Sequence, residues 1–187
     1  MRPPEPATLA HGEVRLEPLG PQHDADLLEA AQDDDVWRWM PILRPRTLAD
    51  VERLREVQPG QAWAVVVGGR ASGTTSYLNV ETDLGGLEIG WTWYATRLWA
   101  TQVNPTCKLL LLGYAFDDLG AARVTLKTDR LNTRSQAAIT KLGCEYDGTL
   151  RHHRLRPDGS VRDTAFFSML AAEWPAAKAR LVVRAGG

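Results

Sequence analysis

The stretch "LEIGWTWYATRLWATQVNPTCKLLLLGYAFDDLGAARVTLKT", residues 87–128, decides the fold class. Its beginning alternates as a strand does, its middle contains an apolar helix that ends at Gly120, and "RVTLKT" is a second strand. A strand–helix–strand unit over residues 86–128 implies a right-handed crossover between two parallel strands. The chain is therefore expected to contain at least one parallel strand pair.

Two hairpins flank this unit. "AWAVVV" and "ASGTTSYLNV" meet at a Gly-Gly turn, and "YDGTLRHHRLR" and "VRDTAFFSML" meet at an Asp-Gly turn. A strand over 13–19, a helix over 21–31 and a helix over 48–57 with Thr47 as N-cap come earlier. A short final helix follows the second hairpin. These elements predict an α/β fold with a mixed sheet and helices on both faces.

Composition limits the classes of function. The chain has 187 residues, of which 22 are basic and 23 acidic, giving a net charge of −1. The length predicts one domain over residues 1–187, and we expect flexible ends at about 1–11 and 182–187. The neutral balance disfavours nucleic acid, and no apolar run could span or anchor in a membrane. The start is not a secretion signal, so we expect a cytoplasmic protein.

Several common sites are missing from the sequence. No G-x-G-x-x-G follows a strand, and no phosphate-binding G-x-x-x-x-G-K-S/T or hydrolase G-x-S-x-G motif occurs. Cys107 and Cys144 lie far apart and are read as reduced thiols, and the four histidines have no metal-ligand spacing. We expect no metal and no cysteine nucleophile.

Two helix starts could hold a polar ligand. Within "RLWATQVNPTCK" (97–108), a helix is expected to begin near residues 104–106 with Pro105 at its first position, and the free amides with the helix dipole favour an anion such as a pyrophosphate. In "DRLNTRSQAAITKLGC" (129–144), Asn132 begins a second helix and Ser135 follows three residues later. An ordinary turn and an ordinary N-cap explain the same residues.

In their order along the chain these segments resemble the GCN5-related N-acetyltransferase (GNAT) superfamily, and most of all its RimJ/RimL-type ribosomal-protein N-terminal acetyltransferases. The match rests on "LEIGWTW", on the block "LKTDxxNxxSxxAIxxLG" followed by "GxLRxHxxxxDGxxRDTxxFS", and on "EWP". It covers about half the chain. The resemblance implies a mostly antiparallel sheet with a central splayed parallel pair, and acetyl-CoA as the donor.

The resemblance also implies where the cofactor lies. The family's phosphate-loop pattern Q/R-x-x-G-x-G/A falls on Arg97, Ala100 and Gln102, so two small residues are replaced and a left-handed φ at Ala100 becomes costly. Lys108 would pair with a phosphate or be a solvated helix residue, and Arg134 would reach a phosphate or lie in solvent. The cofactor-binding residues expected from the resemblance are Trp91, Thr92, Trp93, Arg97, Ala100, Thr101, Gln102, Val103, Asn104, Lys108, Asn132 and Arg134.

Two catalytic residues follow from the same resemblance. Glu88 would act as the base, although a structural salt bridge is an equal interpretation. Ser135 would protonate the departing thiolate, and Asn132 would bind the pantetheine amide while also capping its helix. An amide near residues 91–93 would polarise the thioester carbonyl. Alternation predicts Leu87, Ile89, Trp91 and Trp93 on one face of the strand, and Glu88, Gly90, Thr92 and Tyr94 on the other.

The acceptor site is less defined. Trp37, Trp39 and Met40 are either pocket wall or core. Asp163, His152 and His153 could line the cleft, or Asp163 could pair internally with Arg162. The resulting hypothesis is an N-acetyltransferase that moves acetyl from acetyl-CoA to a primary amine, on a protein N-terminus or a small molecule, by direct attack. Alternatives are another acyl donor such as succinyl-CoA, or a non-catalytic CoA-binding scaffold. The sequence leaves the acceptor and the choice of monomer or homodimer open.

Overall fold

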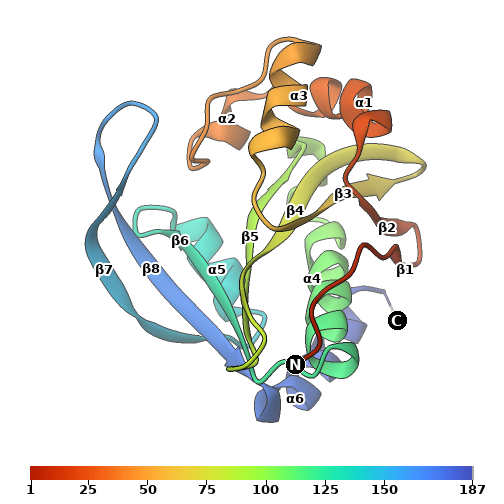
Figure 1. The fold of residues 1–187 in the computed structure, drawn as a ribbon, viewed down its shortest axis with the longest axis vertical. Coiled ribbons are helices and arrows are strands. Elements are labelled where there is room, and N and C mark those ends of the chain that lie inside the picture. Colours follow the sequence, from red (N-terminus) through yellow and green to blue (C-terminus); the bar gives the residue numbers. More distant parts are fainter. Residues whose placement is uncertain (187) are drawn as a thin grey trace.

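The computed structural model describes residues 1–186 and contains one eight-stranded sheet with strand order β1-β2-β3-β4-β5-β6-β8-β7 (Figure 1). Every neighbouring pair is antiparallel except β5–β6. The expected mixed sheet with one central parallel pair is confirmed. The strands are β1 Leu9–His11, β2 Val14–Pro18, β3 Gln61–Val67, β4 Arg70–Glu81, β5 Gly86–Tyr94, β6 Arg123–Asp129, β7 Glu145–Leu155 and β8 Val161–Leu170.

The helices cover both faces of the sheet. They are α1 Asp24–Ala30, α2 Asp34–Trp37, α3 Leu48–Val57, α4 Val103–Gly113, α5 Thr133–Thr140 and α6 Trp174–Arg184. Short turns η1 Pro21–His23, η2 Thr96–Leu98 and η4 Ala171–Glu173 join some of them, and a π-helical turn, η3 Tyr114–Asp118, extends α4. Within residues 1–186, every helix is too short or too polar to cross a lipid bilayer.

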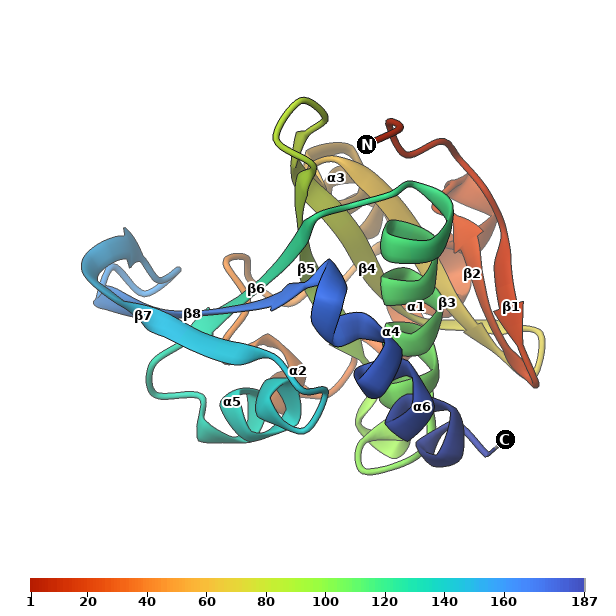
Figure 2. The same cartoon turned by 90° about the horizontal axis from the view of Figure 1, so that it is seen from below.

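Two hydrophobic clusters fill the space between the layers. The larger lies between the sheet and α4, α5 and α6, and includes Leu16, Leu111, Val124 and Met169. Figure 2 shows α4 and α6 side by side on this face. The smaller cluster lies under α1, α2 and α3 on the opposite face and includes Leu27, Val51 and Trp93. Because β3 to β5 contribute to both clusters, these central strands are buried on both faces.

Local signals placed most elements correctly. Thr47 caps α3, with its Oγ1 accepting from the Asp50 amide at 3.2 Å, and Gly159 has φ +82° in the β7–β8 turn. The sequence pattern did not predict β1 and α2, which are only three and four residues long. The sequence pattern also predicted Pro105 as the first residue of its helix. In the structure α4 begins at Val103, and Pro105 occupies its third position. Proline is tolerated there because the first-turn amides have no helical acceptor.

Candidate active site

The parallel strands β5 and β6 separate at one end. Their register runs from Gly86 opposite Arg123 to Ile89 opposite Leu126 and then ends, although both strands continue. Figure 1 shows the two strands together at the lower end of the sheet and apart above it. Beyond Ile89, β5 therefore keeps only β4 as a partner, and its other edge is free for a ligand.

A β-bulge lies where the strands separate. In the β4–β5 register Ser76 faces Gly90 and Thr74 faces Trp93, so two residues of β5 oppose Thr75. Trp91, at the bulge, has φ +50°, which is uncommon for an aromatic residue. Strain of this kind is frequent beside functional sites.

The bulge corrects the expected alternation along β5. Leu87 and Ile89 face the α4 cluster, but Trp93 packs in the opposite cluster and Tyr94 returns to the first. The prediction that Trp91 and Trp93 share a face with Leu87 is wrong, because the extra residue reverses the order of inward and outward side chains. Glu88 therefore points to the α1–α3 face, whereas Thr92 points to the α4 face.

A cavity of about 960 Å³ occupies the space between the separated strands. It is lined by most of the site residues expected from the sequence. These are Trp39, Met40, Glu88, Trp91, Thr92, Trp93, Ala100, Thr101, Asn104, Lys108, Asn132, Arg134 and Ser135. The volume is in the range of small-molecule sites.

The loop before α4 presents unused backbone donors to this cavity. Within residues 1–186, the amides of Ala100, Thr101, Gln102 and Asn104 have no protein acceptor, while Thr101 Oγ1 accepts from the Val103 amide at 3.3 Å. Ala100 has φ +61°, as expected for a position that the family pattern gives to glycine. The loop thus keeps the left-handed conformation despite its Cβ, and its donors suit an anion.

Three expected loop contacts do not reach the cavity. The Arg97 guanidinium donates to Ser72 Oγ at 2.7 Å, which turns it away. The Gln102 side chain is exposed and lies against Gly186, and the Val103 side chain is buried in the core. None of these three side chains lines the cavity, because the local backbone geometry turns each of them away. The backbone amide of Gln102 is still a free donor in this loop.

Glu88 is a buried carboxylate with one unused oxygen. Only 4% of the residue is exposed, and Oε2 accepts from Lys127 Nζ at 2.8 Å and from Asn79 Nδ2 at 2.9 Å. Within residues 1–186, Oε1 is buried without a hydrogen-bond partner. A Cβ on Gly90 would lie 2.9 Å from that oxygen, so Gly90 leaves it room. The structure confirms the salt-bridge interpretation, and the role of Glu88 as a base stays a prediction.

Lys108 is buried on the other face of the split. It is 5% exposed, and its Nζ donates to Thr92 Oγ1 at 3.3 Å. The interpretation as a solvated helix residue is wrong. Burial lowers the pKa of Lys108 to about 8, and no carboxylate within residues 1–186 lies within 4.0 Å of its ammonium group. The Cys107 and Cys144 thiols are themselves buried, which raises the pKa of each to about 12, so neither is a thiolate at neutral pH.

The start of α5 reaches the same cavity. Asn132 Oδ1 accepts from the Ser135 amide at 3.0 Å, which confirms the predicted N-cap. Its Nδ2 and the Ser135 hydroxyl make no hydrogen bond within residues 1–186, and both residues line the cavity. The Arg134 guanidinium lies 3.5 Å from the Trp99 ring centroid. Arg134 therefore stacks on an aromatic ring at the cavity wall and is also exposed to solvent, so both expectations for it stay open.

The acceptor-side expectations are only partly met. Trp39 and Met40 line the cavity, but Trp37 is core, with its ring 5.0 Å from Trp93 and its Nε1 bonded to Ala31 O. Asp163, His152 and His153 do not line it. Asp163 lies 3.6 Å from Arg130 and does not pair with Arg162.

Several lining residues were missed in the sequence. Asn79 and Lys127 hold Glu88, and Asp129 holds Arg156 at 2.7 Å. Arg154 and Arg162 also line the cavity. The alternation of "RVTLKTD" places Lys127 and Asp129 on one face, but the strand that they would meet could not be identified from local pattern alone.

Comparison with known proteins gives the family. A model described as "Acetyltransferase (GNAT) domain" matches residues 13–145. The chain belongs to the GNAT acetyltransferase family. Its members use acetyl-CoA as co-substrate. A comparison with curated proteins gives no match.

Solved structures of GNAT proteins agree with this fold. A provisionally assigned acetyltransferase from T. thermophilus is 35% identical, with a TM-score of 0.88, covering 97% of this chain and 98% of that one. A GCN5-related N-acetyltransferase from Brucella melitensis is 26% identical, with a TM-score of 0.91 and coverages of 98% and 88%. Mycobacterium smegmatis RimJ in complex with CoA-disulfide shares the fold at 20% identity, with a TM-score of 0.83 and coverages of 98% and 97%.

The residues present fit an acyl-CoA. The unpaired amides of residues 100–104 are suited to phosphate oxygens, and the free edge of β5 is suited to an amide-containing arm added like a strand. Within residues 1–186, no group of three His, Cys, Asp or Glu side chains is arranged to bind a metal ion.

Proposed function

We propose that this GNAT protein transfers an acetyl group from acetyl-CoA to a primary amine, as a single domain and in the manner of the RimJ/RimL-type branch. The observation that carries the proposal is Glu88, which lines the cavity where β5 leaves β6 and whose Oε1 is buried without a hydrogen-bond partner within residues 1–186. A carboxylate oxygen held in this position can take a proton from an attacking amine, directly or through one water.

The role of each residue follows from its place around the split. Acetyl-CoA supplies the activated acetyl group. The amides of residues 100–104 hold phosphates, Asn132 Nδ2 donates to an amide carbonyl of the pantetheine arm, and an amide near Trp91 stabilises negative charge on the thioester oxygen. As the amine nitrogen bonds to the acetyl carbon, Glu88 takes its proton. The carbon–sulfur bond breaks, and Ser135 gives a proton to the sulfur; the proton taken by Glu88 then returns to the Ser135 oxygen through water, which restores both side chains.

Lys127 and Asn79 have positioning roles in this proposal. They occupy Glu88 Oε2, which leaves Oε1 as the one oxygen available for the amine. No cysteine is needed, because direct attack requires no protein nucleophile, and neither Cys107 nor Cys144 is a thiolate at neutral pH.

The first experiment is calorimetric titration of the purified protein with acetyl-CoA and with succinyl-CoA, followed by an acceptor screen that measures released CoA thiol. Micromolar binding of acetyl-CoA with turnover supports the proposal. Tighter binding of succinyl-CoA changes the acyl group, and binding without turnover on any amine leaves a CoA-binding scaffold. Ser135→Ala should lower turnover more than affinity, and equal turnover would remove Ser135 as the acid.

A further inference from the structure

Two arginines stand directly opposite each other at the acceptor side of the cavity. Arg154 on β7 is the register partner of Arg162 on β8, and both residues line the cavity. Like charges placed opposite each other on neighbouring strands destabilise a sheet unless something compensates them. This pair therefore needs an explanation beyond folding.

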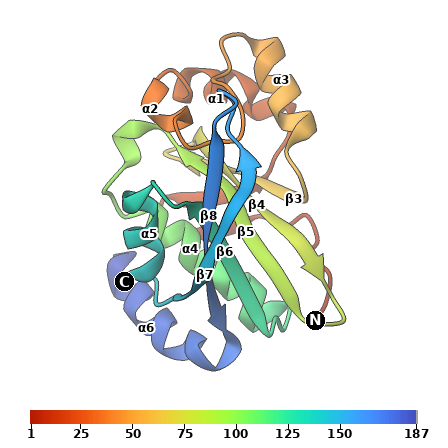
Figure 3. The ribbon, with the colours of Figure 1, turned by 90° about the vertical axis from the view of Figure 1, so that its left-hand side faces the viewer.

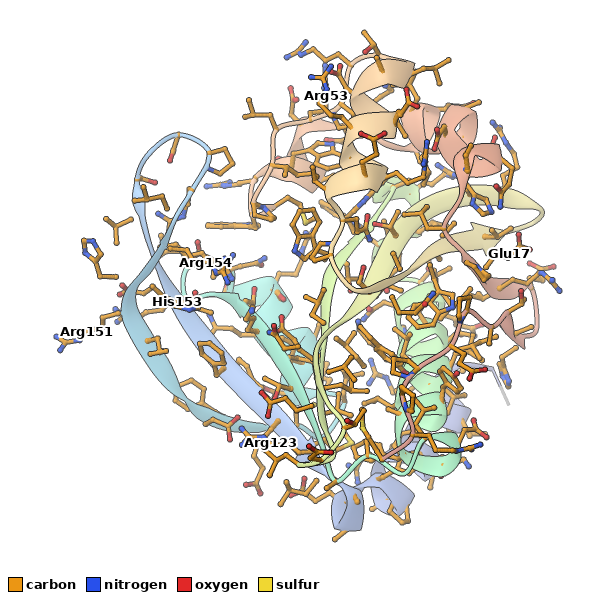
Figure 4. The ribbon with its side chains drawn as sticks, viewed as in Figure 1. Glu17, Arg53, Arg123, Arg151, His153 and Arg154 are labelled. Atoms are coloured by element: carbon orange, nitrogen blue, oxygen red, sulfur yellow. The ribbon has the colours of Figure 1, made fainter. Side chains whose placement is uncertain are left out.

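Strand geometry places both arginines on the face of Glu88. Val124 and Leu126 pack in the core on the α4 side, so Lys127 and Asp129 point to the other face, where Lys127 meets Glu88. Asp129 is paired in register with Thr164 on β8, and Arg162 is two residues further along. Figure 4 shows Arg154 directed toward the body of the molecule, whereas Arg151 of the same strand points outward.

Neither arginine is neutralised by the chain. Arg162 Nε donates to Thr164 Oγ1 at 3.1 Å, and within residues 1–186 no carboxylate lies within 4.0 Å of either guanidinium. The nearby acids are already occupied: Asp129 by Arg156, Glu88 by Lys127, and Asp163 by Arg130. Burial lowers the pKa of Arg162, so its charge is partly removed from water without an anion beside it.

The backbone of the hairpin is irregular where the exposed Arg154 and the half-buried Arg162 meet. Three residues of β7, 151–153, oppose Asp163 of β8, and His152 within this irregular stretch has φ +54°. The His152 amide donates to Asp163 Oδ1 at 2.8 Å, which holds Asp163 away from the cavity. The hairpin thus directs Asp163 away from the cavity, whereas Arg154 and Arg162 line it. Figure 3 shows the hairpin reaching toward the end of the molecule that carries α2.

We propose that Arg154 and Arg162 bind an oxyanion group, a carboxylate or a phosphate, that belongs to the amine acceptor. This inference rests on the proposed acetyl transfer and narrows its substrate class to amines with an acidic group close to the amine. A guanidinium offers paired N–H donors that match both kinds of oxyanion. Because Glu88 shares this face, binding of the anion would bring the amine of the same molecule toward Oε1.

The test uses four short peptides of equal length, each with a free N-terminal amine and an amidated C-terminus. They differ only at the second residue, which is Glu, Gln, phosphoserine or Ser. Acetyl transfer from acetyl-CoA gives kcat/KM for each peptide. Calorimetry on protein saturated with CoA gives each Kd without turnover and with the phosphate sites already filled. The variants are Arg162→Gln, Arg154→Gln and Arg162→Lys, and Arg151→Gln is the matched control on the exposed side of β7.

We expect the wild type to prefer the Glu or phosphoserine peptide over its neutral counterpart by about 10-fold or more in both measurements. The larger of the two preferences identifies carboxylate or phosphate. Arg162→Gln and Arg154→Gln should each reduce the preference to about 3-fold or less. Arg162→Lys should retain part of it, and Arg151→Gln all of it.

Two results would overturn the inference. One is equal binding and equal transfer for charged and neutral peptides in the wild type. The other is a preference that survives in both Gln variants. A calorimetric preference for the charged peptides without any acetyl transfer would support the anion site and count against the proposed function, so the two failures are distinguishable.

Discussion

The two faces of the split between β5 and β6 differ in how their buried charged groups are paired. On the α1–α3 face, Glu88 and Asp129 are buried and each has a cationic side chain against it. On the α4 face, the buried Lys108 donates to the Thr92 hydroxyl, and within residues 1–186 it has no carboxylate beside it and four amides of the preceding loop lack acceptors. The first face pairs its buried carboxylates with cationic side chains. The second has donors in excess.

This difference indicates which face requires a ligand to complete it. A buried ion pair is neutral overall, whereas a buried cation without an anion carries the full cost of leaving water. An acyl-CoA would bring anionic and carbonyl oxygens to the α4 face. The opposite face keeps one carboxylate oxygen of Glu88 free, and two arginines that have no carboxylate partner within residues 1–186, Arg154 and Arg162, lie on the acceptor side of the cavity. Variants that disturb one face at a time test this difference.

The largest effect is expected from Glu88→Gln. Loss of the base should lower kcat by about 100-fold or more, because general-base catalysis contributes at least that much. The acetyl-CoA Kd should change little, since Glu88 lies on the other face. The matched control is Glu81→Gln, an exposed carboxylate at the end of β4. Unchanged turnover in folded Glu88→Gln would contradict the assigned base.

Lys108→Met removes the unpaired buried charge. A lysine whose pKa is about 8 in the folded protein and 10.5 in the unfolded chain destabilises the fold by about 3 kcal/mol below pH 8. This cost disappears as the pH rises from about 8 to 10.5, because the folded state then loses the proton first. The variant should therefore unfold at higher denaturant concentration at pH 7.

The measurement is the difference in free energy of unfolding between wild type and Lys108→Met, followed from pH 7 to pH 10.5. It should shrink as the pH rises. Both proteins contain the Cys107 and Cys144 thiols, so taking the difference removes the contribution of these thiols to the free energy of unfolding. Their raised pKa values lower the stability at high pH, which is opposite to the effect of Lys108. For Lys178→Met, at an exposed position of α6, the difference in free energy of unfolding from the wild type should not change in this way with pH. Acetyl-CoA should bind the Lys108 variant more weakly, and unchanged binding would argue that no ligand compensates this lysine.

Two variants of Asn132 distinguish its role as a helix N-cap from its proposed role in ligand binding. Asn132→Asp keeps the capping oxygen and loses the Nδ2 donor, whereas Asn132→Ala loses both. Both variants should bind acetyl-CoA about 10-fold more weakly, but only the alanine variant should lose about 1 kcal/mol of stability. Thermal unfolding and calorimetry measure the two effects. Equal affinity in the aspartate variant would leave Asn132 as a cap alone.

The smallest effect is expected from Ala100→Gly. Glycine removes the penalty of a left-handed φ, about 1–2 kcal/mol, and adds back part of it through a freer unfolded chain. A net gain of roughly 0.5–1 kcal/mol in stability should follow. In the control Ala25→Gly, at an exposed position of α1, the same replacement should destabilise. A loss of stability at position 100 would contradict the strain.

The sequence by itself determined most of the elements and their order, with β1 and α2 as the exceptions. Turn and capping residues such as Thr47, Asn132 and the Gly68–Gly69 pair act within a few residues of themselves, so their effects are visible locally. The strand–helix–strand unit and its parallel pair followed from the same local signals and from the handedness of crossovers. Part of the cavity wall was also predicted, because the α4 loop and the α5 start contribute to it.

Only the tertiary structure decided how charges meet across strands. The bulge at Trp91 reverses the faces of β5, which sends Glu88 and Thr92 to opposite sides, and no local pattern reports a bulge. Lys127 reaches Glu88 from 39 residues away, and Arg154 meets Arg162 only through the hairpin register. Side-chain partners of this kind depend on which strands are neighbours, and the strand neighbours are fixed when the whole sheet packs.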